Sequence, residues 1–132
     1  MATFPSKHSV DNRTFLTLSI TTAADGLSDV GDLSGHRLAG IETATAWTAA
    51  DIALLGSPLS TASLSEMYAL NSSSTLANMI RVVSTANRIT GFGDKMCDAV
   101  RFIQLASIAT GSTAAVAQAA ARSCRLLLDK LL

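Results

Sequence analysis

The chain is poor in charged residues and in aromatic rings. Only 15% of its 132 residues are Asp, Glu, Lys or Arg, against roughly 25% in ordinary soluble domains. Ten basic and ten acidic residues give a net charge of zero. They are scattered along the chain without a basic stripe, so we expect no nucleic-acid partner.

Long apolar runs are also missing. No stretch approaches the roughly 20 apolar residues that a membrane-spanning helix needs, and residues 1–13 lack the apolar segment of a secretory signal. We therefore expect no membrane partner. The expected location is the cytosol, or a particle assembled there.

Cysteine is scarce, with Cys97 and Cys124 far apart in the sequence. In a reducing compartment the simplest interpretation is two buried thiols. A disulfide stays open as an alternative, because the geometry that pairing requires cannot be read from sequence.

The residues that carry most enzyme chemistry are few and poorly spaced. His8 and His36 have no zinc-like partner spacing, and no G-x-S-x-G elbow occurs. Asp25, Asp29 and Asp32 lie four and three residues apart beside glycines, which favours turns over a calcium loop. We expect a protein without catalytic, metal-binding or cofactor-binding residues.

Alternating apolar and polar residues predict a small all-β domain. The length suits one domain, and strands are expected over 14–21, 36–42, 51–55, 79–83 and 100–108. Gly31 and Gly35 are expected in turns, and residues 64–70 form either a short strand or a turn. Many short strands separated by polar turns are typical of a β-sandwich or jelly roll.

The last third of the sequence has two interpretations. Residues 114–121 (AAVAQAAA) have high intrinsic helix propensity, whereas Cys124, Leu126 and Leu128 alternate as on a strand. We favour a loop or helical turn through Gln118, followed by a closing strand from Arg122.

The first 13 residues form a polar arm without periodicity, and residues 14–132 form the single β-sandwich domain. An aromatic ring in a polar arm has no core of its own to enter, so it suits docking onto a partner. The candidate interface residues are Phe4, Pro5, Trp47, Tyr68 and Phe92.

Three separated phrases resemble a family of small structural proteins encoded by tailed phages and prophages. The first is LSGHRLAGI (33–41), followed by AWTAADI (46–52). The others are TGST (110–113) and QAAAR (118–122), the latter followed by the apolar CRLLL (124–128). In the family they read G-x-R-L-A-G-I, x-W-T-A-A, S-G-T and Q-A-A-x-R in the same order.

The resemblance implies a virion component, and a capsid decoration (cement) protein suits the composition best. Its implied partners are the major capsid protein and further copies of itself, with a trimer favoured. The alternatives are a tail, baseplate or head-to-tail connector component, or a glycan-binding module displayed on the virion. LGSPLS (55–60) replaces the polar Q-x-S-x-D-G turn of relatives, so no carbohydrate ligand is carried over.

Overall fold

The computed structural model describes residues 13–59, 64–66, 81–91 and 100–130, and its regular elements there are all strands. The chain is therefore all-β, as the alternation predicts. The strands are β1 Arg13–Ile20, β2 Leu27–Asp32, β3 His36–Glu42, β4 Ala50–Ser57, β5 Ser65–Glu66, β6 Arg81–Ser84, β7 Ile89–Gly91, β8 Phe102–Ile108 and β9 Arg122–Lys130.

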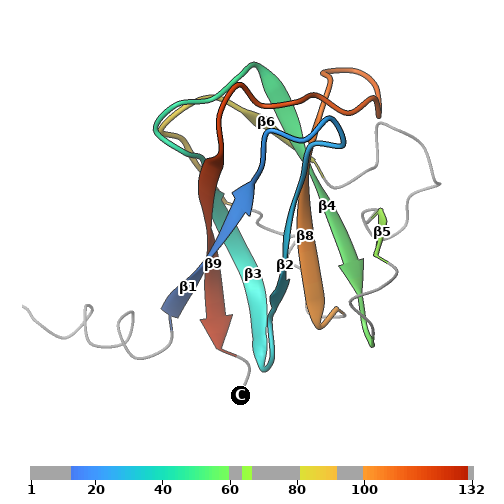
Figure 1. Ribbon diagram of the computed structural model, residues 1–132. Coiled ribbons are helices and arrows are strands. Elements are labelled where there is room, and N and C mark those ends of the chain that lie inside the picture. The colour runs from blue at the N-terminus through green and yellow to red at the C-terminus, as the bar shows by residue number, and fades with distance from the viewer. Residues whose placement is uncertain (1–12, 60–63, 67–80, 92–99, 131–132) are drawn as a thin grey trace, which may run out of the picture.

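The strands form two antiparallel layers joined at one corner (Figure 1). Sheet A has the order β7-β3-β9-β1. Sheet B has the order β2-β8-β4, with both β5 and β6 pairing with β4. A single pair, Ile20 with Ser28, links β1 to β2 and makes the hydrogen-bonded path continuous. The result is a sandwich closed along the β1–β2 corner.

The first and last described strands, β1 and β9, lie side by side in sheet A, with β1 at the corner where the sheet meets β2. β1 pairs with β9 over its whole length, from Arg13 with Asp129 to Ile20 with Arg122. Along both strands apolar residues alternate with polar ones, so one face of each is buried. The start of β9 at Arg122 and the position of β3 agree with the sequence-based expectation.

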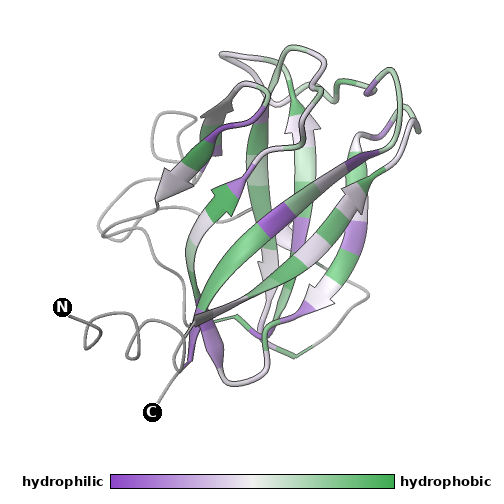
Figure 2. Cartoon of the chain, turned by 90° about the vertical axis from the view of Figure 1, so that its left-hand side faces the viewer, coloured by the Kyte–Doolittle hydropathy of each residue, from purple (hydrophilic) through white to green (hydrophobic). Residues whose placement is uncertain are grey.

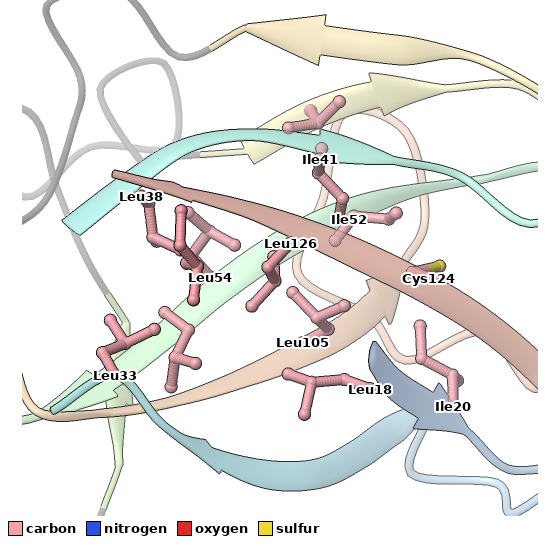
Figure 3. Close-up of a cluster of buried hydrophobic side chains, with 13 residues drawn as sticks. Leu18, Ile20, Leu33, Leu38, Ile41, Ile52, Leu54, Leu105, Cys124 and Leu126 are labelled. Atoms are coloured by element: carbon pink, nitrogen blue, oxygen red, sulfur yellow. The ribbon is translucent and has the colours of Figure 1, made fainter. Parts of the chain in front are cut away.

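The core fills the space between the two sheets (Figure 3). Both layers contribute leucine and isoleucine side chains that are fully or almost fully buried. The largest are Leu18, Ile20, Leu33, Leu38, Ile41, Ile52, Leu54, Ile103, Leu105 and Leu126. Cys124 is a free thiol within the same cluster, which agrees with its interpretation as buried, and Cys97 lies outside the described residues.

The expectation of a turn at Gly31 is wrong, because Gly31 lies within β2. A Cβ atom there would come within 2.5 Å of the Leu16 side chain, so the glycine allows β1 side chains to approach β2 closely. Gly35 does occupy a turn, with φ of 76°. The sequence pattern also missed β2 as a whole and β7.

Residues 114–121 form no helix. They run in an irregular, largely extended path, and Ala115 makes an isolated antiparallel bridge with Ile108 of β8. Alanine-rich segments favour helix by intrinsic propensity, but tertiary contacts override so weak a preference. The contacts responsible involve Gln118.

Candidate functional site

Four of the five predicted interface residues, Phe4, Pro5, Tyr68 and Phe92, lie outside the described residues. Trp47 is half-buried in the β3–β4 connection and packs against the core. Its indole Nε1 donates a hydrogen bond to the Ala50 carbonyl at 3.0 Å. The ring therefore anchors this connection, and only its exposed part is available to a partner.

The outer face of sheet A has the large exposed side chains of the described strands. Phe15 of β1 is 56% exposed, and Ile89 of β7 is 64% exposed. Register places Phe15 opposite Leu127 of β9. Leu127 is in turn opposite Gly40 of β3, which pairs with Gly91 of β7. The apolar side chains Phe15 and Leu127 thus lie at one end of this row, and the two glycines, which have no side chain, lie at the other.

The next row across the same face is charged. Thr17 of β1, Arg125 of β9 and Glu42 of β3 lie opposite one another, and Ile89 follows on β7. Arg125 forms an ion pair with Glu42 through Nε and Nη2. Its guanidinium also lies over the Phe15 ring, 5.2 Å from the ring centre, a distance suited to a cation–π contact.

An open groove of about 750 Å³ follows these residues toward the end of the sheet where β9 begins. Figure 2 views the molecule from the side on which β1, β9 and β3 lie in Figure 1. The lining residues come from β1, β3, β9, the β3–β4 and β8–β9 connections and the β6–β7 turn. They are Phe15, Thr17, Glu42, Thr43, Ala44, Thr45, Ala46, Asn87, Ala121, Arg122, Ser123 and Arg125.

The groove was not predicted, although one signal for it was present. In the alternation over 14–21, Phe15 has the phase of Thr17 and Ser19, which is the phase of the outer face. A large aromatic ring on the polar phase of a strand indicates a surface that a partner covers. The ion pair between Arg125 and Glu42 could not be predicted from the sequence in this way, because it depends on which strands are neighbours in the sheet.

Sheet A is basic and sheet B is acidic. The strands of sheet A carry five basic and two acidic residues, a net charge of +3, and those of sheet B carry one basic and four acidic residues, a net charge of −3. In sheet A these are Arg13, Arg37, Arg122, Arg125 and Lys130 against Glu42 and Asp129. In sheet B they are Arg81 against Asp29, Asp32, Asp51 and Glu66.

A buried glutamine joins two of the phrases on which the family resemblance rests. Gln118 is 2% exposed, and its Oε1 accepts from the Thr48 amide at 2.9 Å. Its Nε2 donates to the Thr48 carbonyl at 3.1 Å and to Ser107 Oγ at 2.9 Å. Arg122 donates to Gln118 Oε1 and Thr48 Oγ1. These polar groups hold the β8–β9 and β3–β4 connections together.

A second buried polar cluster is an ion pair. Arg81 of β6 donates to Asp51 Oδ2 of β4 through Nη2 at 2.7 Å and through Nε at 3.1 Å. It also donates to the carbonyls of Ser112 and Ala109, each at 2.9 Å. Thr110 donates to the other Asp51 oxygen. The pair ties the β8–β9 connection to sheet B.

The acidic residues between β1 and β3 serve as turn and capping groups. Asp25 accepts from the Leu27 amide and Asp29 from the Ser19 amide. Hydrogen bonds from Arg101 and then Ser34 hold the pKa of Asp32 at about 2, below its ordinary 3.8. Within the described residues no group of three or more His, Cys, Asp or Glu side chains is placed to hold a metal ion.

His36 and Cys124 have structural surroundings. The His36 Nδ1 lies 3.0 Å from the Leu33 carbonyl and 2.9 Å from the Ser34 carbonyl, so the ring closes the β2–β3 turn. Burial raises the pKa of the Cys124 thiol, which disfavours the reactive thiolate. Neither side chain contacts a nucleophile–base arrangement in the described structure.

Comparisons with protein-family models, curated proteins and solved structures give no match to this chain. Over the described ranges, no helix has the length and apolarity to cross a bilayer.

Proposed function

We propose that this chain is a structural protein of a tailed-phage virion, and within it a capsid decoration (cement) protein. It is made in the host cytoplasm and binds the outer surface of the major capsid protein lattice, where it stabilises the head. The proposal rests on the three phrases that resemble phage structural proteins and on the small β-sandwich that contains them.

The observation that carries the proposal is the division between buried and exposed chemistry. The buried polar side chains Gln118, Asp51 and Ser107 make their hydrogen bonds within the fold, where these bonds hold the connections between strands in place. The large exposed apolar side chains of sheet A, Phe15 and Ile89, are left at its outer face. Such a distribution suits a protein that acts by contact with other subunits.

Quantitative mass spectrometry of purified particles tests the proposal. The particles come from a strain that encodes this chain, and the major capsid protein serves as the internal reference. A copy number of the same order as that of the capsid protein supports decoration. A copy number that corresponds to one ring favours the tail, baseplate or connector alternative, and absence from the particle refutes a virion role.

A glycan-binding module is the second candidate, because the groove combines the exposed Phe15 ring with Thr17, Thr45 and Ser123 hydroxyls. Sugar sites pair an aromatic platform with polar groups that fix orientation. A glycan array with the wild-type chain tests this. Binding that disappears with Phe15→Ala supports the module, and an empty array rejects it.

A further inference from the structure

The outer face of sheet A is open, whereas that of sheet B is closed. Ala53, Ala106 and Ile108 form a buried cluster outside the main core on β4 and β8, and their exposed fractions are 0–5%. On sheet A, Phe15 and Ile89 are more than half exposed. A partner at the surface of the described fold therefore gains most by covering sheet A.

The chemistry of this face selects an acidic partner. Arg122 and Arg125 line the groove, and Glu42 is the carboxylate among its described lining residues. The exposed Arg37 of β3 lies opposite Asp129 of β9, so the positive excess among these residues comes from the two groove arginines. Surfaces of opposite charge attract at a distance, and surfaces of like charge repel. The strands of sheet A have a net charge of +3, so two copies of this sheet repel one another face to face.

The chain itself supplies an acidic surface, which we call the acidic ridge: Asp25, Asp29 and Asp32, along β2 and the turn before it. All three are exposed. The six residues of β2 span about 20 Å at about 3.3 Å per residue, and Asp25 lies in the turn before them. Asp32 is paired with Arg101 at 3.2 Å. Asp25 and Asp29 accept backbone amides, which leaves their charges in place.

We infer that the chain self-associates head to tail, with the acidic ridge of one copy lying in the sheet A groove of the next. The net charge of zero thus conceals two complementary surfaces on one molecule. A head-to-tail contact joins different surfaces of the two copies, so it closes into a small ring or continues as a filament. The inference does not depend on the proposed virion role.

Sedimentation velocity of the purified full chain at two ionic strengths tests the contact. At about 0.01 M salt the Debye length is about 30 Å, and at about 1 M it is about 3 Å. We expect oligomers at low salt that dissociate at high salt. A chain that is monomeric at every concentration and ionic strength overturns the inference, as do oligomers that high salt strengthens.

Two matched arginine variants localise the contact. Arg125 and Arg101 each form an ion pair with a carboxylate and lie over a phenylalanine ring, at 5.2 and 5.0 Å. Arg125→Glu places a like charge against the ridge, and we expect association to weaken at least about tenfold. Arg101→Glu makes the ridge more acidic, and we expect unchanged or tighter association. Equal weakening by both variants refutes the assignment.

Asp29→Asn tests the ridge with the fold preserved, because an amide oxygen can still accept the Ser19 amide. We expect weaker association and an unchanged unfolding midpoint. If Arg125→Glu fails to fold, judged by Trp47 fluorescence, Arg125→Gln replaces it. Wild-type association in both Asp29→Asn and the Arg125 variant excludes this interface.

Mixing variants distinguishes a head-to-tail contact from a symmetric one. Arg125→Glu keeps its ridge and Asp29→Arg keeps its groove, so the two together can form one native contact. We expect the mixture to form dimers that neither variant forms alone. No association in the mixture refutes the head-to-tail arrangement. Because only this chain is present, the result is separate from whether it occurs in virions.

Discussion

Replacing Gln118 by Leu should lower the free energy of unfolding more than the same replacement of Gln104, the other glutamine of the sequence. The change keeps a side chain of similar size and removes the groups that bind Thr48 and Ser107. A buried polar group that loses its partner costs about 1–3 kcal/mol. Four such groups are affected: the amide and the carbonyl of Thr48, the Ser107 hydroxyl and Arg122 Nε. The half-exposed Thr48 and Arg122 regain part of the loss from water, so we expect about 3 kcal/mol.

The measurement is guanidinium-induced unfolding followed by fluorescence of Trp47, the single tryptophan of the chain, which immediately precedes Thr48. Gln104→Leu is the matched control, because the half-buried Gln104 donates one bond, to the Ser28 carbonyl at 2.7 Å. We expect that control to lose about 1 kcal/mol. Equal losses in the two variants would show that the Gln118 contacts add nothing beyond one ordinary hydrogen bond.

Three further predictions concern other contacts of the fold. Arg81→Met leaves Asp51 as an unpaired charge at 3% exposure and should cost about 3–5 kcal/mol, largely recovered when Asp51→Leu is added; chemical unfolding of both variants checks this. The pKa of Asp32 is lower in the folded chain, about 2 against 3.8, so its stabilising effect is complete above 3.8 and is lost as the pH falls through about 2. Wild-type chain and Asp32→Asn should therefore differ in stability above this window and converge below it. Thr90→Val removes a buried hydroxyl that has no hydrogen-bond partner among the described residues and should raise the unfolding free energy by about 1 kcal/mol, which a lowered midpoint would contradict.

Strands were predictable where side-chain phase alone determines burial. β9 alternates buried and exposed residues, so its start at Arg122 could be read from the sequence. The bounds of β3 were also predicted, although a bulge between Leu38 and Gly40 brings Leu38 and Ile41, three residues apart, to the same buried face. β2 breaks that pattern. Its buried position Ser28 is polar and is satisfied by a bond from the Leu105 amide, and its Gly31 serves close packing. Both features depend on a neighbouring strand.

The candidate site was less predictable than the fold, because it depends on strand order. Arg125 and Glu42 are 83 residues apart in sequence, and only the β3–β9 pairing brings them together. The charge division has the same origin. Acidic and basic residues are mixed along the chain, and the topology sends β1, β3 and β9 to one layer while β2, β4 and β5 go to the other. A net charge cannot reveal such a division.

The positions of the family phrases bear on what the resemblance can predict. The Thr48 and Gln118 phrases meet in one buried hydrogen-bond network. The first phrase contains Gly40, where a Cβ atom would come within 2.7 Å of the Thr90 carbonyl oxygen. These residues are required by packing and by satisfied backbone groups. A resemblance based on these residues therefore supports the architecture directly. It supports a particular partner only indirectly, through the functions of proteins that have this architecture. Phe15, Arg125 and the acidic ridge lie outside the residues that the family patterns specify and outside the buried network, so the resemblance says nothing of the partner that these surface residues select.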